Sequence, residues 1–285
     1  DHLKAPTFSN RATLDEKLRF IRHRHGPPVD LLMLGSSTTL WGVDGDALHD
    51  VLPDRVMLNV GVRDLKIHQA LNLASLYKSL MGEIRDVVMI STMLDFESCA
   101  PGSASLLDHA SALAYASGES GELSTQIREL DPLGILRSAR DIAQRRTSPA
   151  ASPDSLHFDS YGGILLDLPR SAVPDLVWNG SLPAPDERCH AALARLAREL
   201  SGDGIALTFV IAPMRPSYLR RHDPDGVRLA VHRSRLAASA RKSGFRLLDA
   251  HGDLAFADEV FFDAYHVRAP FTHEMTRWIA IQLKK

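Results

Sequence analysis

Short apolar runs alternate along the chain with stretches in which apolar residues recur at helical spacing. A continuous apolar run of about four to eight residues is typical of a strand that is covered on both faces. Such runs occupy residues 30–35, 56–61, 87–91, 205–211 and 245–250. Stretches with helical periodicity occupy residues 13–26, 67–82, 189–200, 226–242 and 271–283. This alternation predicts an α/β fold in which a parallel sheet is wrapped by helices.

The two terminal helical stretches show the pattern clearly. In the first, Leu14, Leu18 and Ile21 share one face, and Thr13 and Glu16 have the spacing of a capping box. The last stretch places four large apolar residues on one face: Phe271, Met275, Trp278 and Ile279. We therefore predict helices that begin near residue 13 and near residue 271.

The rhythm breaks between about residues 100 and 185, which are rich in Ser, Ala, Pro and Gly. Helical segments are predicted at 125–130 and 133–146, followed by a polar break at 147–155. A structureless loop of this length is improbable in a compact domain, so we interpret the region as an insertion. It forms either a lid or substrate wall, or a surface subdomain without a role at the site.

The composition excludes several classes of protein. Hydrophobic residues make up 45% of the chain and charged residues 24%, a mixture typical of globular proteins. The 33 basic and 35 acidic residues give a net charge of −2, and no basic stripe with interleaved aromatic residues is present. We therefore expect no nucleic-acid partner. A length of 285 residues suits a single elaborated domain that spans residues 1–285.

The sequence carries no familiar nucleotide or metal motif. It has no Walker-type loop, no G-x-G-x-x-G after a predicted strand and no H-E-x-x-H. Cys99 and Cys189 lie far apart and match no metal or redox spacing. They form either a disulfide in an oxidising compartment or two buried thiols, and we favour the thiols. We expect neither a metal nor another cofactor.

No apolar stretch approaches the roughly 20 residues that a membrane-spanning helix needs. The sequence begins at Asp1 and not at a methionine. A leader or an N-terminal anchor that precedes this sequence is therefore compatible with it.

Polar side chains follow several of the predicted strands. In an open parallel sheet, ligands bind beyond the carboxyl ends of the strands, so these residues are the first candidates for a site. Strand by strand, they are Gly35, Ser36 and Ser37; Asn59 and Gly61; Ser91 to Asp95; Pro213 and Met214; and Asp249 and His251.

A D-x-x-H pair, Asp263 and His266, stands just before the last predicted helix. A carboxylate that orients an imidazole lets the imidazole act as a general base toward a serine hydroxyl. His251 and His273 are the competing histidines. A glycosidase based on Asp95 and Glu97 is a weaker alternative, because no second carboxylate pair is evident.

These blocks together resemble the SGNH, or GDSL-like, hydrolase family. The sequence LGSS stands where the family has its G-D-S block, NVG matches the second block and DAYH the last. The resemblance implies a flavodoxin-like three-layer α/β/α sandwich with a central five-stranded parallel sheet. It also implies that Ser37 is the nucleophile, with Ser36 in the usual Asp position as a support or a helix N-cap. Asp263 would orient His266.

The same resemblance assigns the oxyanion hole to the backbone amides of Ser37 and Gly61. The third block departs from the family pattern, because TMLD at residues 92–95 places Leu94 where the family has an asparagine donor. One such donor is commonly worth about 3 kcal/mol of transition-state stabilisation. Thr92 is the candidate replacement, together with Ser91 or Asn59.

The segments GSSTTLWGVDGDAL and VIAPMRPSY resemble a divergent branch of this family. That branch includes bacterial cell-surface polysaccharide O-acetyltransferases and the D-alanine transfer proteins of teichoic acids. The resemblance implies a serine O-acetyltransferase or acetylesterase that acts on a polysaccharide, with a membrane-embedded acyl-donor partner. It also implies a periplasmic or other extracytoplasmic location behind an N-terminal anchor.

Five further residues are candidates for contact with a substrate: Trp41, Arg63, Asp95, Arg215 and Tyr265. Aromatic faces can pack against sugar rings, and the two arginines can meet an acidic polymer. Trp41 is also a candidate for the core. A noncatalytic carbohydrate-binding or assembly component stays open as the alternative function, because a fold alone does not determine activity.

Overall fold

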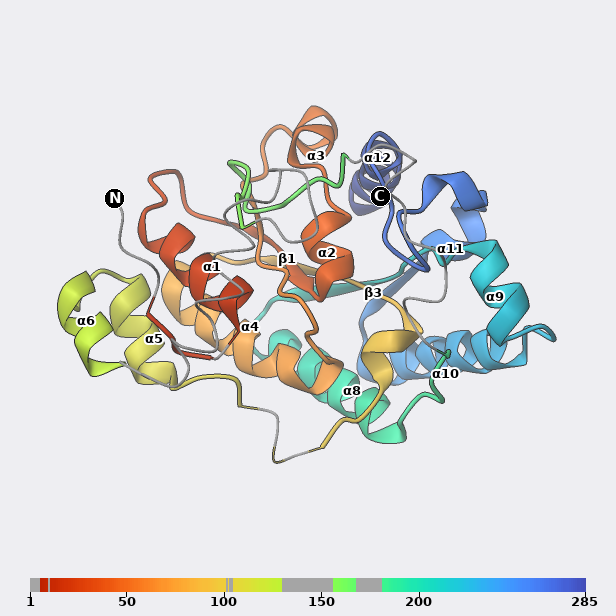
Figure 1. Ribbon diagram of the computed structural model, residues 1–285, viewed down its shortest axis with the longest axis horizontal. Coiled ribbons are helices and arrows are strands. Elements are labelled where there is room, and N and C mark those ends of the chain that lie inside the picture. The colour runs from red at the N-terminus through yellow and green to blue at the C-terminus, as the bar shows by residue number, and fades with distance from the viewer. Residues whose placement is uncertain (1–5, 10, 101, 103–104, 130–155, 168–180) are drawn as a thin grey trace.

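A computed structural model of the protein describes residues 6–9, 11–100, 102, 105–129, 156–167 and 181–285. Its centre is a sheet of five parallel strands in the order β2-β1-β3-β4-β5 (Figure 1). The strands are β1 (Leu31–Gly35), β2 (Met57–Asn59), β3 (Asp86–Ser91), β4 (Ala206–Ile211) and β5 (Arg246–Asp249). This is the flavodoxin-like order. The predicted α/β fold with a five-stranded parallel sheet is confirmed.

The continuous apolar runs form strands because both faces of the sheet are covered. In β1, all five residues are buried. Leu32 and Leu34 enter one hydrophobic cluster, whereas Leu31 and Met33 enter a second cluster on the opposite face. Side chains alternate across a strand, so a strand that is buried on both sides is a nearly continuous apolar run.

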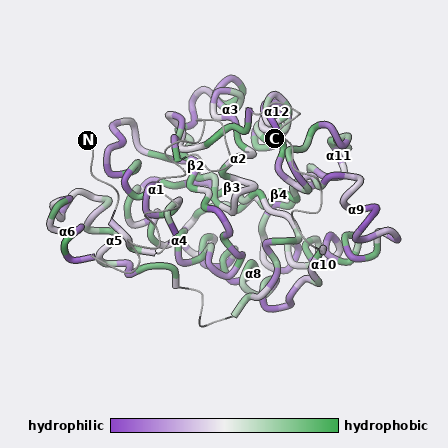
Figure 2. The backbone as a smooth tube through the Cα atoms, viewed as in Figure 1, coloured by the Kyte–Doolittle hydropathy of each residue, from purple (hydrophilic) through white to green (hydrophobic). Residues whose placement is uncertain are grey.

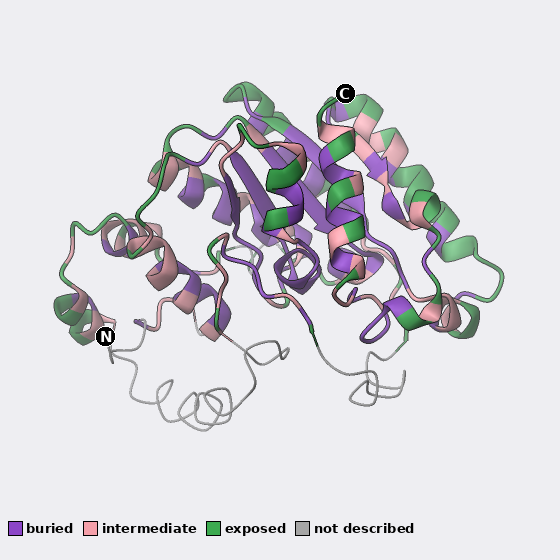
Figure 3. Ribbon diagram, turned by 90° about the horizontal axis from the view of Figure 1, so that it is seen from above, coloured by how far each residue is buried: buried purple, intermediate pink, exposed green. Residues whose placement is uncertain are grey.

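Two layers of helices cover the sheet, and Figure 3 shows the buried strands between helices whose outer faces are exposed. The layer on one face contains α1 (Ala12–Arg22), α4 (Ile67–Met81), α5 (His109–Ala116), α8 (Glu187–Gly202) and α10 (Val227–Ser243). The other face is covered by α3 (Gly45–Val51), α11 (Ala250–Leu254) and α12 (Phe271–Leu283). Hydrophobic and hydrophilic residues alternate along the outer helices, as α8 and α10 show in Figure 2. This is the pattern of helices with one face in the core.

The first helix begins and ends differently from the prediction. It starts at Ala12, so Thr13 lies inside it and is buried, and the predicted capping box is wrong. Ser9 lies just before the helix and forms hydrogen bonds with its first turn. The Ser9 hydroxyl donates to Asp15 and accepts from the Arg11 N–H. The helix ends at Arg22, four residues before Gly26.

The described parts of the predicted insertion pack against the rest of the molecule. Helix α5 contacts α1 and α4, and α6 (Glu122–Arg128) contains most of the helical segment predicted at 125–130. Residues 156–167 contribute Ile164 and Leu166 to an apolar cluster. The helix predicted at 133–146 and the break at 147–155 lie outside the described residues.

Cys99 and Cys189 form a disulfide, so the preference for two thiols is wrong. The two residues are separated by 90 positions, and only the three-dimensional structure brings them together. In the part of the chain that the structure describes, no helix has the length and apolar character to cross a membrane.

Candidate active site

Ser37 lies at a sharp turn between β1 and the short helix α2 (Ser37–Trp41). The turn requires a glycine at position 35, because a Cβ atom there would overlap the Thr39 hydroxyl and approach the Ile90 carbonyl oxygen at 2.9 Å. Ser36 is the N-cap of α2, and its hydroxyl accepts from the Thr38 N–H at 3.3 Å. The expected N-cap role of Ser36 is therefore seen, and Ser37 stands at the first helical position.

Ser37, His266 and Asp263 form one continuous chain of hydrogen bonds. The Ser37 Oγ atom lies 2.8 Å from His266 Nε2, and His266 Nδ1 lies 2.7 Å from Asp263 Oδ2. All three residues are buried, with 7% or less of their surface exposed. Ser37 and His266 are 229 residues apart in the sequence. This is the geometry that a nucleophile, a base and an orienting carboxylate require.

The Asp263 carboxylate is held as an anion. Burial alone would raise its pKa, but the His266 imidazole and the N–H groups of Tyr265 and His266 lower it below the ordinary value. Both N–H groups donate to Asp263 Oδ1, at 3.0 and 2.9 Å. The second oxygen is thereby left for the imidazole, which fixes the direction of the ring.

Asp95 forms a hydrogen bond to the turn that carries Ser37. It lies in the short 3-10 helix η1 (Met93–Phe96) after β3 and is buried. Its Oδ2 atom accepts from the Ser91 hydroxyl at 2.8 Å, the Ser36 hydroxyl at 3.1 Å and the Thr92 N–H at 3.2 Å. Burial raises the pKa of Asp95, and these hydrogen bonds oppose that rise. The carboxylate therefore faces protein donors.

The backbone N–H of Gly61, the expected oxyanion donor, already has an acceptor. Its N–H donates to Asn59 Oδ1 at 2.9 Å, while Asn59 Nδ2 donates to the Thr39 carbonyl at 2.9 Å. A Cβ atom on Gly61 would lie 2.5 Å from the Leu40 nitrogen, so glycine lets this segment approach α2. The structure thus gives Gly61 a packing role and leaves its amide without a free hydrogen.

The backbone N–H groups of Ser37 and Asp64 at this edge have no acceptor among the residues that the structure describes. Asp64 has a φ of 59°, a left-handed conformation that is uncommon for residues other than glycine. Strained residues of this kind cluster at functional sites. The Thr92 N–H is taken by Asp95, and the Leu94 side chain packs in an apolar cluster. No pattern in the sequence indicates the Asp64 conformation.

Trp41 and Tyr265 both contact the His266 imidazole. The ring centroids of Trp41 and His266 are 4.5 Å apart, and those of Tyr265 and His266 are 4.1 Å apart. Trp41 is only 2% exposed, and the Arg63 guanidinium lies 5.6 Å from the centre of its ring. Burial and the nearby carboxylates raise the pKa of Tyr265. Two of the five substrate candidates, Trp41 and Tyr265, therefore contact the imidazole, and a third, Arg63, lies near the Trp41 ring.

The remaining candidates have other neighbours. The Arg215 N–H donates to the Ala264 carbonyl at 2.8 Å, and its guanidinium Nε lies 3.7 Å from Asp258. His273 pairs with Asp44 at 3.1 Å, and His251 Nδ1 accepts from the Met214 N–H.

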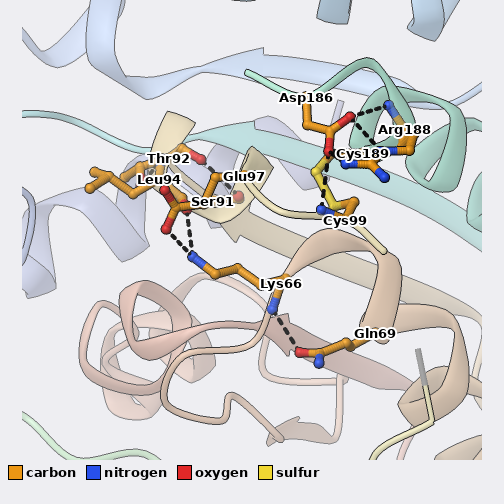
Figure 4. Close-up of a disulfide and its surroundings, with 10 residues drawn as sticks. All are labelled: Lys66, Gln69, Ser91, Thr92, Leu94, Glu97, Cys99, Asp186, Arg188 and Cys189. Atoms are coloured by element: carbon orange, nitrogen blue, oxygen red, sulfur yellow. Dashed lines mark hydrogen bonds and ion pairs between the residues drawn. A yellow bond between two sulfur atoms is a disulfide. The ribbon is translucent and has the colours of Figure 1, made fainter. Parts of the chain in front are cut away.

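Contacts from Lys66, Asp186 and Cys189 hold the segment that carries Asp95, and Figure 4 shows those that end at Leu94, Glu97 and Cys99. Lys66 Nζ lies 3.0 Å from the Leu94 carbonyl oxygen and 2.6 Å from Glu97, so Glu97 is engaged in an ion pair. On the far side, the Asp186 N–H donates to the Phe96 carbonyl and the Cys99–Cys189 disulfide joins the segment to α8. Asp95 and Glu97 are thus structural partners here and do not form the open carboxylate pair of a glycosidase.

A buried lysine lies beneath the end of β2. Lys17 Nζ donates to the Asn59 carbonyl at 3.0 Å and to the Gly162 carbonyl, and it lies 3.9 Å from the centre of the Phe158 ring. Burial lowers the pKa of Lys17 to about 7, with Asp159 opposing the shift. Lys17 therefore connects the described segment 156–167 to the residue that holds the Gly61 amide.

No family model matches the chain, and no curated protein matches it. Solved structures with a similar chain trace include a proposed arylesterase of Agrobacterium tumefaciens, with 12% identity and a TM-score of 0.46, over 90% of this chain and 98% of that one. A proposed acylhydrolase of Bacteroides fragilis has 10% identity and a TM-score of 0.43, over 95% and 94%. A Lactobacillus plantarum protein has 13% identity and a TM-score of 0.43, over 91% and 96%. The roles of the site residues rest on the geometry described above and not on these resemblances.

Proposed function

We propose that the protein is a serine acyl-transfer enzyme of the SGNH type. The observation that carries this proposal is the buried hydrogen-bond chain from Ser37 through His266 to Asp263. A serine hydroxyl is a weak nucleophile by itself, and a base within hydrogen-bond reach activates it. The base is in turn oriented by a carboxylate that is held as an anion.

In the first half-reaction, His266 Nε2 takes the proton of Ser37 as Oγ forms a bond to the carbonyl carbon of an ester. The tetrahedral intermediate then collapses, the bond to the leaving alcohol breaks, and His266 returns the proton to that alcohol. Ser37 is left as an acyl ester. Asp263 stabilises the imidazolium that forms between these two steps.

The negative charge on the carbonyl oxygen needs hydrogen-bond donors. We assign these to the Ser37 and Asp64 N–H groups, since both lack an acceptor among the described residues. This assignment replaces Gly61, whose amide bonds to Asn59, and Thr92, whose amide bonds to Asp95. Asp95 then serves the nucleophile turn and does not contact substrate.

In the second half-reaction, His266 deprotonates an acceptor hydroxyl that attacks the acyl ester and releases Ser37. Water as the acceptor makes the protein an acetylesterase, and a sugar hydroxyl makes it an O-acetyltransferase. We favour a bacterial extracellular or cell-surface polysaccharide as the carbohydrate, on the resemblance of the LGSS and VIAPMRPSY segments. A membrane-embedded partner would supply the acyl group in the transferase case.

An extracytoplasmic location is part of the proposal. Disulfides form and persist mainly in oxidising compartments such as the periplasm. The Cys99–Cys189 bond supports such a location. Expression with and without export, followed by a count of free thiols, tests it. Two free thiols in the exported protein would contradict it.

The decisive experiment is the intact mass after treatment with a serine-directed fluorophosphonate. We expect a single adduct on the wild type, on Ser37, and none on Ser37→Ala. Ser36→Ala is the matched control, because it removes the neighbouring hydroxyl and leaves the Ser37–His266 bond in place. A folded wild type without an adduct, or an adduct that persists in Ser37→Ala, would overturn the proposal.

The occupied Gly61 amide and the apolar Leu94 favour one alternative, a noncatalytic carbohydrate-binding component. Turnover of 4-nitrophenyl acetate by water supports the esterase. Turnover only with an oligosaccharide acceptor supports the transferase. Polysaccharide binding that survives Ser37→Ala, without any turnover in the wild type, supports the binding component.

A further inference from the structure

The two aromatic rings at the His266 imidazole suggest a role beyond the triad. We call Trp41 and Tyr265 the aromatic pair. In the resting protein the imidazole has hydrogen bonds at both ends, to Ser37 at Nε2 and to Asp263 at Nδ1. In an acyl-enzyme, Ser37 Oγ has no proton and is bonded to the acyl carbon, so the bond at Nε2 is lost. Only Asp263 then holds the ring by a hydrogen bond.

We propose that Trp41 and Tyr265 are positioning residues that keep the His266 imidazole in place during the second half-reaction, after Ser37 is acylated. The proposal rests on the proposed function. The contacts that carry it are the ring-centroid distances of 4.5 Å from Trp41 and 4.1 Å from Tyr265. A single hydrogen bond lets a ring pivot and tilt, whereas ring contacts restrict both motions. A general base displaced by about 1 Å can lose about a hundredfold in rate.

Trp41 is itself firmly held. It stands four residues after Ser37 in α2, so both side chains lie on the same face of that helix. Its ring packs in a cluster with Leu40, Ile164 and Phe262. With 2% of its surface exposed, Trp41 offers almost no face to a substrate, and the charged or polar groups near its ring are the His266 imidazole and the Arg63 guanidinium.

Tyr265 is held from the other segment of the site. Its N–H donates to Asp263 Oδ1 at 3.0 Å, and its side chain packs against the cluster that contains Met93 and Met214. The aromatic pair therefore links the nucleophile helix, the 3-10 helix after β3 and the loop with the acid. An imidazole in contact with both rings is fixed relative to all three.

The test separates the two half-reactions. With 4-nitrophenyl acetate, the burst of 4-nitrophenol reports acylation, and the later steady rate reports deacylation. In Tyr265→Leu and Trp41→Leu we expect deacylation to fall about 10- to 100-fold and acylation to fall less than about threefold. Acetyl-Ser37 then accumulates and is seen in the intact mass after acid quenching.

The conservative variants keep a ring and should rescue the effect. Tyr265→Phe and Trp41→Phe are expected within about threefold of the wild type in both half-reactions. Phe256→Leu is the control for loss of an aromatic residue elsewhere, because Phe256 packs on Phe261 and Phe271. An equal fall of both rates in the leucine variants would overturn the proposal. So would a Tyr265→Phe defect as large as that of Tyr265→Leu, which would assign the role to the hydroxyl.

A second measurement does not depend on turnover. The proton on His266 Nδ1, shared with Asp263, should give a downfield NMR resonance, since the imidazole is buried. The resonance is recorded in a Ser37→Ala background, which lacks the bond at Nε2 as the acyl-enzyme does. In that background we expect the leucine variants to broaden it through exchange with water, and the phenylalanine variants to keep it. A wild type without a fluorophosphonate adduct would contradict the proposed function. A resonance that is unchanged in both leucine variants would contradict the positioning role of Trp41 and Tyr265, whether or not the adduct forms.

Discussion

The two sides of the candidate site differ in how complete they are. On the base side, Ser37, His266 and Asp263 are joined by hydrogen bonds of 2.8 and 2.7 Å. On the oxyanion side, the Gly61 amide is bonded to Asn59 and the Thr92 amide to Asp95. Activation of the nucleophile is thus preformed, whereas much of the expected donor set is committed to other acceptors.

This difference indicates where the reaction barrier lies. General-base catalysis contributes about 10²- to 10⁴-fold, and each oxyanion donor contributes about 10²- to 10³-fold. A site with a complete base and few donors should therefore turn over simple esters slowly. A substrate or partner that frees the Gly61 amide would accelerate it.

The largest expected effect breaks the base side. Asp263→Asn removes the anion that orients the imidazole, so we expect ester turnover to fall about 10³-fold or more. The measurement is kcat for 4-nitrophenyl acetate, with the fluorophosphonate labelling rate beside it. Asp258→Asn is the matched control, because Asp258 pairs with Arg215 and Arg220 outside the triad. A loss of kcat smaller than tenfold would contradict the role of Asp263 in orienting the His266 imidazole.

The next effect concerns the tether on the oxyanion side. The disulfide joins Cys99, three residues after the 3-10 helix with Asp95, to Cys189 in α8, and it closes a loop of 90 positions. We expect its reduction to lower the free energy of unfolding by about 3 kcal/mol. Urea denaturation with and without a phosphine reductant measures this. The Cys99→Ser/Cys189→Ser double variant should be insensitive to the reductant, and an equal response in both proteins would contradict the assignment.

A smaller effect comes from Lys17 beneath Asn59. Burial lowers its pKa to about 7, so between pH 7 and about 10 the unfolded chain binds a proton that the folded protein has lost. The destabilisation by the buried charge is complete below pH 7 and is relieved as the pH rises through this window. We expect Lys17 to make the protein about 2 kcal/mol more stable at pH 9 than at pH 7.

The measurement is the difference between wild type and Lys17→Met in the free energy of unfolding at each pH. Lys78→Met is the control, since Lys78 forms an exposed ion pair with Asp203. The wild type should gain stability relative to Lys17→Met from pH 7 to pH 9. A flat difference would show that Lys17 keeps an ordinary pKa.

The sequence predicted the base side because its signals are local. Each apolar run marks a strand, and the carboxyl ends of parallel strands meet at one edge, so Ser37 could be placed at that edge. The D-x-x-H pair before the last helix was joined to Ser37 by the resemblance of the sequence blocks to the SGNH family. Helix α3 was not predicted, because seven residues span too few turns for a periodic pattern. The fold could therefore be predicted in its strands and long helices.

The oxyanion side could not be predicted, because its outcome depends on contacts between distant segments. The Asn59 side chain accepts from the Gly61 amide while its own amide donates to the Thr39 carbonyl, 20 positions away. The burial of Lys17 depends on the Gly162 carbonyl, which is 145 residues away. The disulfide likewise joins segments 90 positions apart. None of these pairings leaves a pattern in a single sequence.

The sharpest test of the comparison adds a donor to the weak side. Leu94 stands where the resembling family has an asparagine, and its side chain packs in an apolar cluster. In Leu94→Asn, an amide would enter the site, and we expect kcat for 4-nitrophenyl acetate to rise about tenfold, less than the full value of a preorganised donor. Leu94→Met is the control for altered packing and should leave kcat within about twofold. The labelling rate with the fluorophosphonate should rise with kcat, because the added donor also stabilises the charge that develops on phosphorus-bound oxygen. If Leu94→Asn is folded and no faster than Leu94→Met, the existing donors are sufficient, and the difference between the two sides has no effect on the rate.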